Sequence, residues 1–189
     1  MVNTFSELES SQKKFIFASS QMAGMTHSTY GVLKLLGEKM ATAIGGRTMR
    51  FWNVYGVETE IDRAHVITDF INQAAVSGKI KMLTNGEESR DFLHVEDCGR
   101  AVEIIIDNYG SIDIPRIVDI AFFKYTTIIE LAKLIANKFN ASIEVPSNSD
   151  KVQQGFSFDP NREILKFWQP KISLDEGIQR VAKELGYEK

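Results

Sequence analysis

The chain has 189 residues, of which 43% are apolar and 25% charged, and its formal net charge is −3. These proportions are ordinary for a globular chain, and they favour neither a fibrous architecture nor a disordered one. No dense run of Lys and Arg occurs along the sequence. We therefore do not expect a nucleic-acid binder, because neutralising phosphates requires a basic face.

Cys98 is the single cysteine, so an internal disulfide bond is impossible, and no zinc-type spacing surrounds it. We expect no metal site and a reducing compartment. The first 14 residues are polar and charged where a signal peptide would be apolar, and no run approaches the ~20 apolar residues of a membrane-spanning helix. The sequence predicts a cytoplasmic protein with no membrane partner.

Apolar runs and helical spacing alternate along the first half of the chain. The residues predict the end of a helix over 3–10, a buried strand over 15–18, a helix over 29–44 stopped by Gly45-Gly46, a strand over 48–51 and a helix over 65–76. Strand, helix, strand and helix in succession indicate parallel crossover connections.

The second half carries local start signals for helices. Asp97 is placed to cap a helix running to about residue 108, and Thr127 with Glu130 and Ser173 with Glu176 fit the capping box. Those boxes predict helices over 127–139 and 174–185. Strands are expected over 80–83 and 117–121, and the polar stretch 147–155 is the expected lobe boundary.

Ser20 ends the first predicted strand, and Tyr30 and Lys34 follow in the first turns of the next helix. Residues four apart on a helix share one face, so the phenol and the ammonium can enter one pocket. The ammonium would stabilise the phenolate for proton exchange with a substrate hydroxyl, to which Ser20 could also bind. Because a Tyr-x-x-x-Lys pair also occurs by chance, an interfacial aromatic beside a solvated lysine remains an open alternative.

Several motifs in order resemble one family, the extended short-chain dehydrogenases that act on nucleotide sugars, known as the NAD-dependent epimerase/dehydratase group. The resemblance rests on 15–20, on Tyr30 to Lys34 with Glu38 following, on 50–56 and on the segment Ser-Arg-Asp-Phe-Leu-His-Val-Glu-Asp at 89–97, and it extends to the tail at 158–186. The segment at 89–97 is the most specific of these motifs.

The resemblance implies an α/β fold: a partial Rossmann-like parallel sheet with flanking helices and a small C-terminal α/β substrate lobe. Residues 1–56 would be the C-terminal part of an NAD(P)-binding Rossmann-like domain. Residues 57–189 would form mainly the substrate-binding lobe, with about 92–121 returning to the first domain.

The family's chemistry can be carried over to matching positions. Tyr30 would be the acid/base, Lys34 would hold the nicotinamide ribose of NAD or NADP, and Ser20 would orient the sugar hydroxyl or ketone. Tyr30 and Lys34 would therefore contact the cofactor as well, and Val54 is assigned to the cofactor with them.

The remaining implied contacts concern a nucleotide-sugar substrate. Asn53 would touch its diphosphate or sugar, Leu83 would pack against its base, and Arg90 would pair with its diphosphate. The alternatives are that Asn53 caps a turn and that Arg90 forms a surface ion pair with a neighbouring carboxylate, Asp91 or Glu88.

The sequence departs from the family at three places. Ser20 is followed by Gln-Met-Ala-Gly-Met where most members have Val-Tyr-Gly, and 151–156 contains no second phosphate-binding arginine. None of the 13 glycines forms the Gly-x-Gly-x-x-Gly loop that binds a pyrophosphate. We therefore expect the C-terminal part of a longer enzyme, in which 15–17 lie on an open sheet edge that favours a homo-oligomer or a strand partner.

Two functions follow from these observations. The first is an NAD(P)-dependent nucleotide-sugar epimerase/dehydratase-type enzyme that uses Ser20, Tyr30 and Lys34 for proton and hydride transfer. The alternative is a chain that binds nucleotide sugars without catalysis, or one half of a split enzyme.

Overall fold

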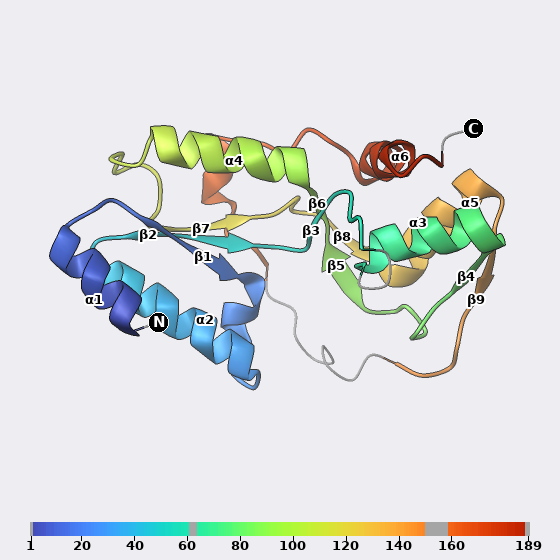
Figure 1. Ribbon diagram of the computed structural model, residues 1–189, viewed down its shortest axis with the longest axis horizontal. Helices are drawn as coiled ribbons and strands as arrows, with labels where there is room; N and C mark the ends of the chain where they lie inside the picture. Colours follow the sequence, from blue (N-terminus) through green and yellow to red (C-terminus); the bar gives the residue numbers. More distant parts are fainter. Residues whose placement is uncertain (1, 61–63, 150–158, 188–189) are drawn as a thin grey trace. The chain divides into compact units, whose positions relative to one another are not determined.

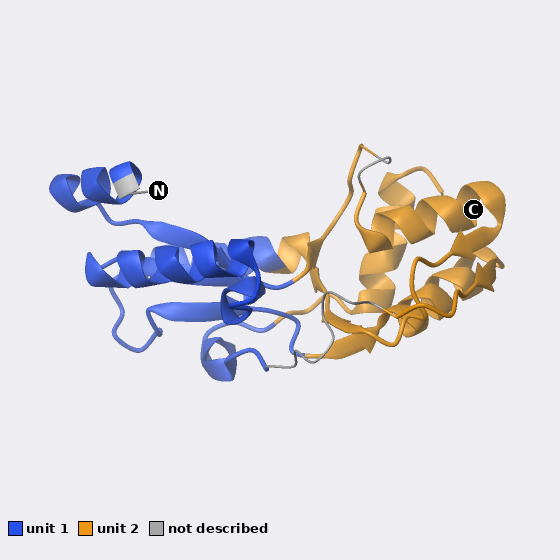
Figure 2. Cartoon of the chain, turned by 90° about the horizontal axis from the view of Figure 1, so that it is seen from below, with its two compact units in different colours: residues 1–52, 98–123, 157–169 blue, residues 53–97, 124–156, 170–189 orange. Residues whose placement is uncertain are grey.

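The computed structural model describes residues 2–60, 64–149 and 159–187. The chain forms two compact units, each built from several separate segments (Figure 2). Unit 1 comprises Met1–Trp52, Cys98–Phe123 and Ser157–Gln169, and unit 2 comprises Asn53–Asp97, Lys124–Phe156 and Pro170–Lys189.

Unit 1 contains a three-stranded parallel sheet in the order β1-β2-β7, which confirms the expected parallel crossovers. Its neighbouring strands place Ser19 beside Arg50 and Arg50 beside Asp119. Helices α1 and α2 lie on one side of this sheet and α4 on the other (Figure 1). The elements are α1 (Val2–Ser11), β1 (Ile16–Ser20), the 3₁₀ helix η1 (Gln21–Gly24), α2 (Thr29–Ala43), β2 (Arg47–Phe51), α4 (Val95–Asp107), β7 (Ile117–Ile120) and the 3₁₀ helix η3 (Arg162–Lys166).

Local signals set the two ends of α2. At its start, the Ser28 hydroxyl accepts a hydrogen bond from the Gly31 backbone N–H at 3.4 Å, which satisfies one of the first helical donors. At its end, Gly45 takes a positive φ of 83°, a conformation that favours glycine and stops the helix. The helix therefore occupies almost the range that the sequence predicts.

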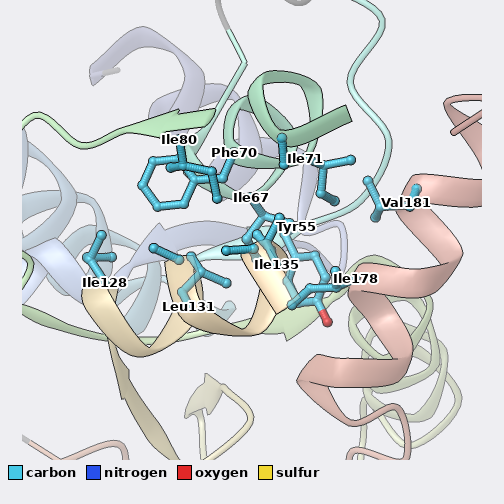
Figure 3. Packing of buried hydrophobic residues seen from close by; sticks show 14 of the residues in the cluster. Tyr55, Ile67, Phe70, Ile71, Ile80, Ile128, Leu131, Ile135, Ile178 and Val181 are labelled. Carbon is cyan, nitrogen blue, oxygen red and sulfur yellow. The ribbon is translucent and has the colours of Figure 1, made fainter. Parts of the chain in front are cut away.

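Unit 2 is built on three helices that enclose one apolar core. Ile67, Ile71, Leu131, Ile135 and Ile178 are at most 1% exposed and meet in its centre (Figure 3). Three pairs of short strands complete the unit: β3-β6 and β4-β9 are parallel, and β5-β8 is antiparallel. The elements are β3 (Val54–Tyr55), α3 (Val66–Ser77), β4 (Lys79–Lys81), β5 (Ser89–Asp91), β6 (Leu93–His94), β8 (Tyr125–Thr127), α5 (Ile128–Phe139), β9 (Ser142–Glu144) and α6 (Leu174–Glu184).

The expected α/β fold class, with a partial Rossmann-like parallel sheet, is confirmed.

The capping box at Thr127 is confirmed with both of its hydrogen bonds, and Ser173 caps α6 by accepting from the Glu176 N–H. The prediction that Asp97 caps α4 is wrong, because the helix already begins at Val95 and Asp97 lies in its first turn. Two predictions concern residues that the structure does not describe. Of the expected loop over 147–155, residues 150–155 lie outside the described ranges. The stretch 151–156, in which the family's second phosphate-binding arginine was sought, lies entirely outside them.

Candidate functional site

Ser20 is the last residue of β1, and its backbone is extended. Its hydroxyl oxygen accepts a hydrogen bond at 3.2 Å from the backbone N–H of Met22 and so caps η1. The hydroxyl hydrogen is not used in this bond, since the oxygen is the acceptor. Ser20 can therefore act as a hydrogen-bond donor at the carboxyl end of a parallel strand, where ligands of open α/β sheets bind.

Lys34 contacts both β1 and Tyr30. Its Nζ donates a hydrogen bond at 2.7 Å to the carbonyl oxygen of Ala18 and lies 5.5 Å from the centre of the Tyr30 ring. The ammonium also lies 5.4 Å from the centre of the Phe17 ring. The face of an aromatic ring attracts a cation that lies above it. The lysine head group is thereby held between the helix and the strand that ends in Ser20.

Tyr30 is 52% exposed, so the residue is open to solvent. An ammonium has three N–H donors, and the hydrogen bond from Lys34 to Ala18 uses one of them. Tyr30 and Lys34 together offer a phenol and a cation on one face of α2, which is the arrangement expected from their spacing. Such a pair can move a proton to or from a hydroxyl group.

Gly31 explains why the first turn of α2 lies so close to the residues after Ser20. A Cβ atom at Gly31 would collide with the carbonyl oxygens of Met22 and Met25. The close approach is thus open only to glycine, and it brings Tyr30, the preceding residue, to the segment that follows Ser20. Sequence reasoning had assigned no role to this glycine.

A buried carboxylate joins α2 to two strands of the sheet. Glu38, 1% exposed, accepts a hydrogen bond from the Ser19 hydroxyl at 2.6 Å and two from Arg50, from Nε at 2.7 Å and from Nη2 at 2.6 Å. Donating these hydrogen bonds to Glu38 raises the pKa of the Arg50 guanidinium. We call Ser19, Glu38 and Arg50 the α2 anchor. In the sequence Glu38 stands out only as part of the family motif, although a charged residue on the sheet-facing side of a helix is a signal for a buried ion pair.

The other candidate residues lie in unit 2. Asn53 donates from Nδ2 to the Asp91 carbonyl oxygen at 3.1 Å, and Val54 pairs with Leu93 between β3 and β6. Arg90 donates from Nη1 to the Ser89 carbonyl oxygen at 2.9 Å.

Leu83, also in unit 2, is 87% exposed, which is unusual for a leucine. The structure therefore gathers Ser20, Tyr30 and Lys34 in unit 1, and it places the four remaining candidates in unit 2.

The described residues contain neither a metal-binding cluster nor a membrane-spanning helix. Among them, no group of three or more His, Cys, Asp or Glu side chains is arranged to hold a metal ion. Within the same ranges, no helix has the length and apolar character needed to cross a membrane.

The fold is shared with solved nucleotide-sugar enzymes. One is the UDP-glucose 4-epimerase of Thermotoga maritima, solved with UDP-glucose: the TM-score is 0.70 at 22% identity, and the match covers 96% of this chain and 66% of that one. Fold and local geometry together define a Rossmann-like α/β chain that presents a Tyr-Lys pair at the end of a parallel strand.

The model of the NAD dependent epimerase/dehydratase family matches residues 6–121, and the chain belongs to this family. A putative UDP-glucose 4-epimerase of Methanocaldococcus jannaschii is 30% identical over 165 residues, covering 82% of this chain and 52% of that protein. UDP-glucuronic acid decarboxylase 5 of Arabidopsis thaliana is 28% identical over 138 residues, covering 70% and 38%. The chain thus spans about half, or less, of the length of these curated relatives.

Proposed function

We propose that the chain is the part of an NAD(P)-dependent nucleotide-sugar epimerase/dehydratase-type enzyme that binds the sugar nucleotide and moves its proton. The observation that carries this proposal is the position of Lys34, which binds the carbonyl of Ala18 and lies against the Tyr30 ring. Membership of an NAD-dependent family and the UDP-sugar names of its relatives support the substrate class.

In this proposal Tyr30 exchanges a proton with a hydroxyl group of the sugar. Lys34 stabilises the phenolate that remains and donates its other N–H bonds to ribose hydroxyls of the cofactor. Ser20 donates its hydroxyl hydrogen to the same sugar oxygen and orients it. When bound, the nicotinamide would take up or return a hydride.

The residues present fit the nicotinamide end of NAD or NADP, because a solvent-open phenol and an ammonium with unused donors stand on one helix face. The pyrophosphate end would be held elsewhere, since no Gly-x-Gly-x-x-Gly loop occurs in the 189 residues. We propose that further residues of the same polypeptide, or a partner chain, supply that loop.

For unit 2 we propose contacts with the substrate. The Arg90 guanidinium would bind the diphosphate, for which its planar set of donors is suited, and Asn53 would bind the diphosphate or the sugar. Leu83 would pack on the nucleotide base, which would account for an apolar side chain that is 87% exposed. Val54, 36% exposed, would contact the cofactor. Unit 1 would then be the cofactor part and unit 2 mainly the substrate part.

A further proposal concerns assembly. Within the described residues β1 pairs with β2 alone, so its other edge offers unpaired backbone groups to another strand. We propose that a second copy or a partner chain pairs there. Light scattering would detect the assembly, and slow amide exchange over residues 15–19 would locate it; a monomer with fast exchange at those amides would contradict it.

The experiment for the main proposal is a fluorescence titration of the chain with NADH, with and without UDP-glucose or UDP-glucuronic acid. Saturable NADH binding that Lys34→Met weakens and that Tyr30→Phe preserves would support it, with Tyr30→Phe losing any hydride exchange. Tyr187→Phe, a change in unit 2 outside the proposed site, is the matched control.

The second candidate function is a chain that binds nucleotide sugars without catalysis, or one half of a split enzyme. It is favoured by the lack of a glycine-rich loop in the sequence. Binding of a sugar nucleotide without any NADH binding would select it. If the chain binds neither ligand, both functions are overturned for the chain alone.

A further inference from the structure

We propose that Glu38 is a positioning residue, whose buried carboxylate sets the place of α2 on the sheet and thereby the place of Tyr30 and Lys34. The significance of this role for catalysis rests on the proposed function. The role itself is a statement about geometry, and it can be tested without any turnover.

The helix side of the argument is the spacing. Tyr30, Lys34 and Glu38 follow one another at intervals of four, so they lie along one face of α2. Glu38 is fully buried at one end of this row, Lys34 contacts the strand, and Tyr30 is half exposed at the other end. A rotation or slide of the helix that moved Glu38 would move all three side chains together.

The sheet side is the register of β1 and β2. Ser19 and Arg50 are register partners on these strands, so both point to the same face, and both bind the Glu38 carboxylate. Ser19 directly precedes Ser20. The carboxylate therefore ties α2 to the strand position next to the candidate catalytic serine.

Packing around the α2 anchor restricts the helix further. A Cβ atom at Gly37 would collide with the Phe17 ring, and one at Gly31 with backbone carbonyl oxygens. These close contacts prevent α2 from moving nearer to the sheet. Apolar packing alone, however, would still allow the helix to slide along the surface of the sheet. The two parallel hydrogen bonds from Arg50 to Glu38 have one good geometry, which removes that freedom.

The test measures acetylation of Lys34 relative to Lys39 by mass spectrometry after limited treatment with an amine acylating reagent. Both lysines belong to α2, and Lys39 is exposed, so it corrects for reagent and for overall opening. In the native chain the contact with Ala18 protects Lys34. We expect Arg50→Lys, which keeps the charge but loses the paired hydrogen bonds, to raise the Lys34 to Lys39 ratio about threefold to tenfold, as for the loss of one hydrogen bond.

Arg47→Lys is the matched control. Arg47 lies three residues earlier on the same strand, and its guanidinium donates to backbone carbonyls of Tyr109, Ile114 and Pro115 instead of contacting α2. The same substitution there destabilises unit 1 without touching the α2 anchor. Its Lys34 to Lys39 ratio should equal that of the native chain.

Glu38→Gln leaves the Arg50 charge without its partner and can fail to fold. The double variant Glu38→Gln with Arg50→Gln removes both charges and should recover folding, while the labelling ratio stays raised. An unchanged ratio in Arg50→Lys and in the folded double variant would overturn the proposal. The NADH titration of the native chain judges the proposed function separately, because labelling requires no cofactor.

Discussion

The Asp97 carboxylate accepts a hydrogen bond at 2.8 Å from the backbone N–H of Ile172, which lies 75 residues later in the chain. Its other oxygen accepts from the Lys171 N–H at 2.9 Å, and the side chain is completely buried. Both donors belong to the segment that leads into α6. A single side chain in the first turn of α4 therefore satisfies two backbone N–H groups of that segment, of which the Ile172 donor is buried.

Asp97→Asn should destabilise unit 2 by about 2–3 kcal/mol, because the amide NH₂ would face one of the two N–H donors. The measurement is urea unfolding followed by circular dichroism. Glu103→Gln is the control, since Glu103 is exposed on the same helix and its loss should change the stability little. Equal midpoints for the two variants would refute the role given to Asp97.

Burial lowers the pKa of His94, and its Nδ1 accepts a hydrogen bond from the Glu96 N–H at 3.3 Å, which requires a deprotonated nitrogen. The native state therefore prefers the neutral ring, and the unfolded chain binds more protons. The stability due to His94 is complete above the unfolded pKa of about 6.5 and is lost as the pH falls through the native value.

Urea unfolding at several pH values between about 7 and 5 measures this effect. The native chain should lose stability with falling pH more steeply than His94→Gln. Parallel slopes for the native chain and His94→Gln would show that another group controls the pH dependence.

Gly31→Ala should separate the first turn of α2 from η1, because the added methyl group has no space beside the Met22 and Met25 carbonyl oxygens. We expect a loss of about 1–3 kcal/mol, as for other overpacked sites. Thermal unfolding measures it. Gly99→Ala is the matched change, since a Cβ on that helical glycine meets nothing within 4 Å, and it should stabilise by about 0.5–1 kcal/mol.

Burial raises the pKa of the Cys98 thiol to about 11. At pH ~8 only about one thiol in a thousand is then ionised, so the native chain should react with iodoacetamide about 100-fold more slowly than the unfolded chain. Because Cys98 is the single cysteine, mass spectrometry of the intact chain gives the rate directly. Similar rates in buffer and in urea would contradict the burial of this thiol.

Much of the helical structure could be predicted because its signals are local. The helix at Thr29–Ala43 follows from apolar spacing and a glycine stop, all within about 20 residues of one another. The capping box at Thr127 is equally local. The short strands β8 and β9 were not predicted, since three residues carry too little periodicity and the strands exist through pairing with β5 and β4.

The sequence by itself determined the family, the helix that carries Tyr30 and Lys34, and the order of strand and helix, because each depends on neighbouring residues or on motifs. Only the tertiary structure decided what the buried charges do. Glu38 meets Ser19 and Arg50 through strand register, and Asp97 meets Ile172 across 75 residues. A charge removed from water requires partners, and the fold, which brings distant segments together, determines which partners it finds.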